Sequence, residues 1–256
     1  MKVRKRHFVF AGVGIVLFAA LTLWTNHIPE PKYQGVGLGI YLTTTRTAPG
    51  YMRAHREGRE AINAMGASAV PYLERQIEKD PMREFLIRIA PKMPSKVASM
   101  FPDRYAYLHR RSTAAGLLPE AGTNAVSALP RLLAIAEAES PNYTHNLIRA
   151  IGMLAAGTEY EDGARRLILK VVNEARSDRD RELRLMSYHF LGTLGGNEVL
   201  PALIDGLKEP RMVDRCIESL VRLGTNAIPQ LKKVAEGETG HIRPATLALE
   251  KVQAGR

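Results

Sequence analysis

The sequence predicts an all-α protein, an α-solenoid of stacked helix pairs that is preceded by an N-terminal transmembrane helix. Three observations support this prediction. A short glycine-to-proline segment recurs along the chain, apolar residues around it keep the i, i+3, i+4, i+7 spacing of one helix face, and an uncharged apolar run follows a basic N-terminus. We therefore expect one elongated helical domain behind a membrane anchor.

The recurring segment has the composition of a joint between two helices. It occurs at residues 66–73, 196–203 and 224–231, and again at residues 122–130, where the Gly and the Pro are three residues further apart. We expect its Gly to cap the first helix in a left-handed conformation and a Thr, Asn or Ser to supply an N-cap oxygen. Its Pro suits the first turn of the second helix, where no N–H is needed.

Apolar stripes on both sides of the joints define five helix pairs and a lone terminal helix. The pairs are predicted at residues 53–77, 107–136, 147–175, 183–207 and 213–235, and the last helix at 243–252. Pro201 and Pro229 are 28 residues apart, and Pro130 and Pro201 are 71 apart, which is two units of about 35. Because no pair can bury its apolar face alone, neighbouring pairs must stack.

Two segments depart from this rhythm. Residues 27–52 are rich in Gly and Pro and are predicted to be a linker, with a short ordered piece around residues 33–42. Residues 81–106 contain four prolines and a strongly apolar stretch, so we expect an insertion that packs against the helical array. Its five basic residues against two acidic ones leave open a contact with an anionic membrane surface.

The joints resemble those of one repeat family. Leu-Gly closes the first helix at Leu194-Gly195 and Leu223-Gly224, and Ala-Val-Pro or Ala-Ile-Pro opens the second at residues 69–71 and 227–229. This pattern resembles HEAT repeats of the short kind, called HEAT-like or bilin-lyase-type repeats. The resemblance covers roughly residues 53–253 and is to proteins of the membrane-anchored bacterial type. The resemblance implies the stacked-pair fold for residues 53–256. It says almost nothing about function.

The first 26 residues are predicted to be an uncleaved signal anchor with its transmembrane helix at residues 8–24. Basic residues precede this uncharged run, and no Ala-x-Ala cleavage pattern ends it. The positive-inside rule then places the N-terminus in the cytoplasm and the repeats on the periplasmic or extracellular side of a single-pass inner-membrane protein. Secretion after signal cleavage is the alternative.

The expected function is a scaffold that binds another protein and performs no catalysis. Cys216 is the only cysteine, the seven histidines show no metal-ligand spacing, and no catalytic motif is found, so we expect no metal, cofactor or small-molecule substrate. Five basic residues are predicted to line a groove along the second helices: Arg131, Arg166, Lys170, Lys208 and Lys233.

Two alternatives remain for such a basic face. By analogy within the repeat family it could serve a lyase or a DNA glycosylase, or it could bind nucleic acid. The overall charge is +10, but four basic residues precede the apolar run, and without them 32 basic residues face 26 acidic ones. That modest excess does not require a nucleic-acid partner, and an exported chain would not meet DNA.

Overall fold

The structure, a computed structural model, describes residues 29–44, 50–101, 103–139, 144–175, 177, 180–237 and 242–254. The described chain is mostly helical, which confirms the all-α prediction. Its only strands in this part are the two-residue pieces β1 (Lys32–Tyr33) and β2 (Val36–Gly37), paired antiparallel. The predicted transmembrane helix at residues 8–24 lies outside the described residues, and within them no helix is long and apolar enough to cross a membrane.

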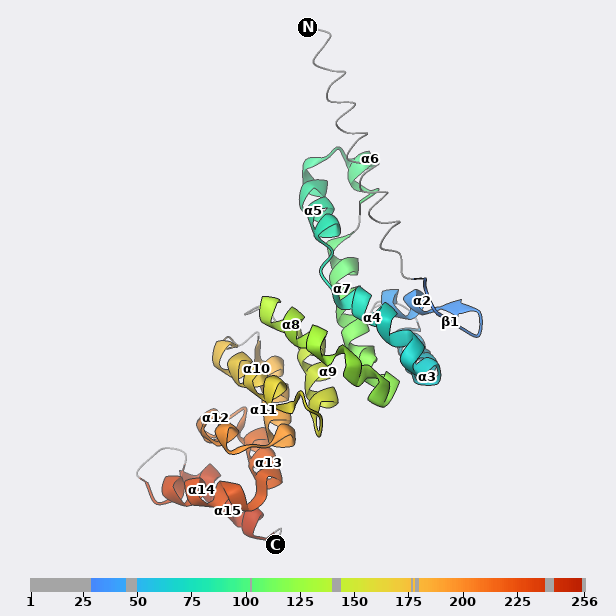
Figure 1. Cartoon of the computed structure of the whole chain (residues 1–256). Helices are drawn as coiled ribbons and strands as arrows, with labels where there is room; N and C mark the ends of the chain where they lie inside the picture. Colours follow the sequence, from blue (N-terminus) through green and yellow to red (C-terminus); the bar gives the residue numbers. More distant parts are fainter. Residues whose placement is uncertain are drawn as a thin grey trace, which may run out of the picture.

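The helices follow one another as pairs along an elongated molecule (Figure 1). We call the members of a pair the first and the second helix. The first helices are α3 (Tyr51–Met65), α7 (Arg104–Leu117), α9 (His145–Ala155), α11 (Arg181–Leu194) and α13 (Val213–Leu223). The second helices are α4 (Val70–Ile77), α8 (Leu129–Glu139), α10 (Glu161–Glu174), α12 (Leu200–Gly206) and α14 (Ile228–Ala235), and α15 (Ile242–Ala254) ends the array.

Equivalent positions of the four joints are buried alike, which is what a repeated unit requires. The small residue just before the second helix and the Leu four residues later are both fully buried in every copy. They are Ala69 and Leu73, Ala128 and Leu132, Val199 and Leu203, and Ala227 and Leu231. The Pro between them is exposed in each copy and lies in the first turn of the helix, as predicted.

The joints are closed by backbone hydrogen bonds, and the predicted side-chain N-caps are wrong. A 3₁₀ turn precedes the second helices at η1 (Gly66–Ala69), η3 (Leu118–Ala128), η5 (Asn197–Val199) and η6 (Gly224–Ala227). In each of these turns one carbonyl accepts the N–H of the first residue of the following helix, so that group needs no side-chain oxygen. The Ser68 hydroxyl instead donates to the Met65 carbonyl.

Gly224 ends its helix at φ 62° and ψ −135°. The positive φ was predicted, but this ψ lies outside the left-handed helical region and in backbone space that favours glycine. Gly224→Val is therefore expected to lower the free energy of unfolding by roughly 1 to 3 kcal/mol. A urea titration of the chain from Pro29 onward measures this loss, and an unchanged midpoint would count against the joint.

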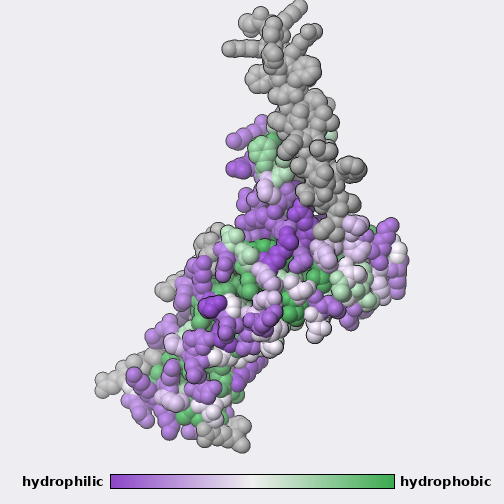
Figure 2. All heavy atoms as spheres, viewed as in Figure 1, coloured by the Kyte–Doolittle hydropathy of each residue, from purple (hydrophilic) through white to green (hydrophobic). Residues whose placement is uncertain are grey.

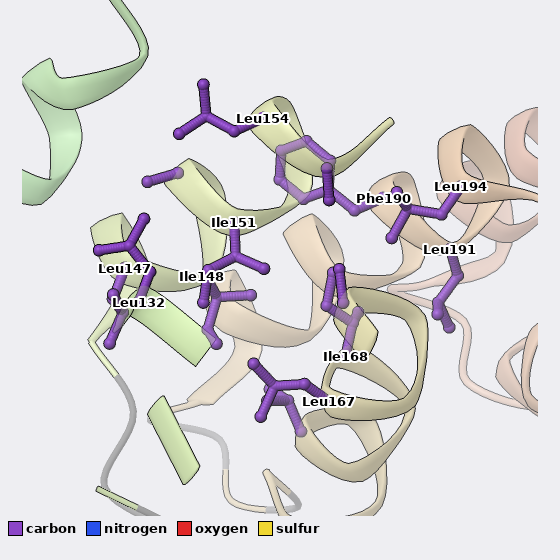
Figure 3. Packing of buried hydrophobic residues seen from close by; sticks show 14 of the residues in the cluster. Leu132, Leu147, Ile148, Ile151, Leu154, Leu167, Ile168, Phe190, Leu191 and Leu194 are labelled. Carbon is purple, nitrogen blue, oxygen red and sulfur yellow. The ribbon is translucent and has the colours of Figure 1, made fainter. Parts of the chain in front are cut away.

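Stacked pairs share one hydrophobic core. Side chains of α8, α9, α10 and α11 meet between the two layers of helices (Figure 3). Ten buried side chains that the apolar stripes place on core faces are labelled there: Leu132, Leu147, Ile148, Ile151, Leu154, Leu167, Ile168, Phe190, Leu191 and Leu194. Each second helix also packs on the first helix of the following pair, so the core continues from pair to pair.

The first helices form a continuous row because glycines let them approach closely. From α7 the row runs through α9, α11 and α13 to α15. A Cβ added at Gly152 of α9 would lie 2.3 Å from the Phe190 ring of α11. A Cβ at Gly192 of α11 would lie 2.6 Å from the Cα of Ser219 on α13. Neither site has room for any larger residue without a shift of a neighbour.

Part of the predicted linker is an ordered helix. The helix α2 (Leu38–Thr43) packs on α3 and α7, and its Leu38 and Leu42 are fully buried. The backbone N–H of Gly39 donates to the Glu30 carboxylate, which fixes the start of this helix. The array of packed helices thus begins before residue 53, since the apolar side chains of α2 are part of the core beside the first helix pair.

The insertion at residues 81–106 does not pack against the array, contrary to the prediction. It forms α5 (Pro81–Ile89), η2 (Ala90–Lys92) and α6 (Ser95–Ala98), which project from one end of the molecule (Figure 1). None of the described side chains from Pro81 to Ala106 is buried. Apolar composition alone does not bring a segment into the core when it is held only at its two ends.

Candidate functional site

The candidate site is the exposed surface of the second helices, which we call the second-helix face. Helices α8, α10, α12 and α14 follow one another along one side of the molecule (Figure 1). All five predicted basic residues are exposed there, on α8, α10 and α14 or, for Lys208, two residues beyond the end of α12. The structure thus places them along four consecutive pairs.

Three of these five basic residues are paired with carboxylates. Arg131 contacts Glu78, which follows the preceding second helix. The Nζ of Lys170 lies 3.9 Å from Glu174, and that of Lys208 lies 2.7 Å from Asp205. Among the described residues, no carboxylate lies within 4 Å of the other two, Arg166 and Lys233. The second-helix face is therefore of mixed charge, rather than the basic rim that the sequence suggested.

A buried ion pair beside this face ties the ends of α4 and α8 to the middle of α7. Arg111 on α7 and Glu139 at the end of α8 are both buried and hydrogen-bonded to each other. The Nε of Arg111 also donates to the Ile77 carbonyl at the end of α4, at 2.8 Å. This arginine therefore fixes the second helices α4 and α8 relative to each other.

Two further buried arginines also join neighbouring elements in later pairs. Arg165 of α10 binds the Leu194 carbonyl at 3.0 Å and the Glu198 carboxylate at 2.6 Å, which joins α10 to the next joint. Arg184 of α11 contacts Glu209 beyond α12 at 3.2 Å. Sequence reasoning missed all of these contacts. One signal was present, since Arg111 and Arg184 each stand 11 residues before a glycine of positive φ in the joint that follows, Gly122 and Gly195.

The comparisons with known proteins do not identify the second-helix face. No protein-family model, curated protein or solved structure matches this chain.

The pKa shifts of Cys216 and His189 favour the uncharged form of each side chain. Burial raises the pKa of the Cys216 thiol, so the reactive thiolate is disfavoured. Burial, and then the charges of Arg222 and Arg215, lower the pKa of His189, whose Nδ1 lies 2.8 Å from Nη1 of Arg222. Within the described residues, no group of three or more His, Cys, Asp or Glu side chains is placed to hold a metal ion.

A second surface feature is a shallow hollow of about 710 Å³ on α3. Three arginines line it, together with His55 and Glu120, and guanidinium groups suit carboxylate or phosphate anions. Arg53 is paired with Glu57 at 2.6 Å, and Arg59 with Glu120 at 2.9 Å. Because all three arginines are exposed and two of them are already paired, we assign no ligand to the hollow.

Proposed function

We propose that this protein is a HEAT-like α-solenoid that serves as a scaffold and binds another protein along the second-helix face. In this proposal the apolar run at residues 8–24 anchors the chain in the inner membrane. The repeats then lie on the periplasmic or extracellular side, in keeping with the basic residues ahead of the run. The repeats bind the partner there and catalyse no reaction.

The observation that carries the proposal is the continuous exposure of the second helices over four pairs. Stacked pairs buried on one side leave a long surface on the other, and such surfaces are where repeat proteins bind their partners. The surface ion pairs of Lys170 and Lys208 contribute little to stability, so a partner's charges can replace them at little cost. Buried arginines such as Arg111 keep the spacing of the helices below.

The test uses charge reversal along the second-helix face in the full chain. Changing Arg166 and Lys233 to Glu removes the two cations that have no acidic partner among the described residues. Crosslinking in intact membranes followed by purification should then recover a specific partner with the unchanged chain and at least ten-fold less of it with the variant. That factor corresponds to about 1.4 kcal/mol.

A control places a single charge reversal on another surface. Arg243→Glu in α15 alters an exposed basic residue outside the second helices, and partner recovery should stay unchanged. Equal recovery with the Arg166 and Lys233 variant would refute binding at this face. The same membranes test the anchor, since the chain should remain in the pellet after a high-salt wash.

A further inference from the structure

The projection formed by residues 81–103 is firmly held at its base and unpacked beyond it. The Asp80 carboxylate accepts the N–H groups of Met82 and Arg83 at 3.0 and 3.1 Å, which starts α5. The Tyr107 hydroxyl accepts the Asp80 N–H at 2.9 Å. Asp103 accepts the Ala106 N–H at 2.7 Å and starts α7. The chain therefore leaves and re-enters the array at fixed points.

Exposed apolar side chains concentrate on this projection and the turns of α7 beside it. Of the ten large apolar side chains that are exposed in the described part of the chain, five lie between residues 85 and 108: Phe85, Met93, Met100, Tyr105 and Leu108. On α5, Met82, Phe85, Leu86 and Ile89 keep the spacing of one helix face. Figure 2 shows hydrophobic surface on this part of the molecule, at the top of the view. Such a patch is typical of a docking site.

Most of the basic residues of the projection have no acidic partner among the residues that the structure describes. Residues 81–104 contain five basic and two acidic residues. The ion pair of Arg83 with Asp80, at 3.3 Å, lies at the base. In the described part of the chain, no carboxylate lies within 4 Å of Arg88, Lys92 or Arg104. On the second-helix face, by contrast, most of the predicted cations are paired.

We infer that the projection docks on the surface of an anionic lipid bilayer. The apolar stripe of α5 enters the boundary between headgroups and acyl chains, and Arg88 and Lys92 lie among the lipid phosphates. Cationic and apolar side chains together match this surface. A second copy of the chain would bring the same excess of positive charge to the contact and so be repelled.

The position of the projection agrees with this occupant. Residues 1–28 join the array at Pro29, just ahead of β1 and α2, and α2 packs on α7, the helix that the projection leads into. The His109 ring of α7 also lies 3.1 Å from the Thr44 carbonyl just after α2. The inference rests in part on the anchor of the proposed function, and it adds a second membrane contact at the same end of the array.

The test places a lipid-sensitive probe on the projection of the full chain. Phe85→Cys and Leu247→Cys introduce thiols at side chains of nearly equal exposure, 41% on α5 and 43% on α15. Cys216 is fully buried and should not react with the label. Each labelled chain is reconstituted into vesicles of phosphatidylcholine, with or without phosphatidylglycerol, in which part of the lipid carries bromine on its acyl chains.

We expect bromine to quench the Phe85→Cys label in vesicles that contain phosphatidylglycerol and to leave the Leu247→Cys label unaffected. Arg88→Gln and Lys92→Gln should each lower the ratio of docked to undocked projection by roughly five-fold, as expected for basic residues near an anionic surface. A Phe85→Cys label that is quenched no more than the Leu247→Cys label would overturn the inference. A change in the fluorescence of the Phe85→Cys label that depends on the number of chains per vesicle, without quenching by bromine, would also overturn it. Such a change indicates contact with another protein chain.

In this experiment, membrane binding by the anchor and membrane binding by the projection are measured separately. Flotation of the chain with phosphatidylcholine vesicles after a high-salt wash reports the anchor. Quenching at residue 85 reports the projection. A chain that floats but shows no quenching contradicts the projection alone, whereas a chain that fails to float yet is quenched on phosphatidylglycerol vesicles contradicts the anchor alone.

Discussion

Replacing Arg111 with Met is expected to lower the free energy of unfolding by about 3 to 5 kcal/mol. The change leaves the buried Glu139 carboxylate without its main partner, because Lys79 is 3.9 Å away and half exposed. It also removes the donor that binds the Ile77 carbonyl at 2.8 Å. Urea unfolding of the chain from Pro29 onward measures the loss.

Two further variants distinguish the effect of an unpaired buried charge on the free energy of unfolding from the general effect of removing an arginine. Arg53→Met breaks an exposed pair with Glu57 and should change the free energy of unfolding by less than about 1 kcal/mol. Adding Glu139→Met to Arg111→Met should recover most of the stability, since no charge then stays buried alone. A double variant no more stable than Arg111→Met would show that the cost is not that of an unpaired carboxylate.

Gly192→Ala is expected to destabilise the array by at least about 3 kcal/mol, although Ala favours helix by about 1 kcal/mol over Gly. The new Cβ would lie 2.6 Å from the Cα of Ser219, and a backbone atom cannot rotate away. Helices α11 and α13 would have to separate. Amide hydrogen exchange should therefore rise in α13 and α15 more than in α7.

Gly163→Ala is the matched control, because it also replaces a helical glycine. Its Cβ would lie 3.4 Å from a Leu133 methyl carbon, an ordinary contact. This variant should be neutral or up to about 1 kcal/mol more stable. If both variants kept the stability of the unchanged chain, close helix approach at Gly192 would not be important for the fold.

The helical class, the joints and the core faces could be predicted because each depends on neighbours in sequence. Leu73 and Leu231 stand at the same distance after their joint glycines, and both are fully buried. The helical period and the position of proline are local signals, so they can be recognised in the sequence without knowledge of the fold. The same holds for the positive φ of Gly224.

The rest depends on contacts between distant residues. Nothing near Gly192 in the sequence shows that Ser219 lies against it, and nothing near Arg111 shows that Glu139 ends a helix at its side. The projection was misplaced for a related reason. The apolar residues around Phe85 suggested burial, but whether a segment reaches the core depends on where its two ends are fixed, here at Asp80 and Asp103.

The row of first helices has a mechanical consequence. Along the row, α9, α11 and α13 each pack between the row helices before and after, so tension applied between the two ends of the array would pass through these contacts in series. The weakest contact would then yield first, whatever the strength of the others. The close approach of the backbones at Gly192 and Ser219 would resist shear, whereas α15, the last described helix, has a neighbour in the row on one side only.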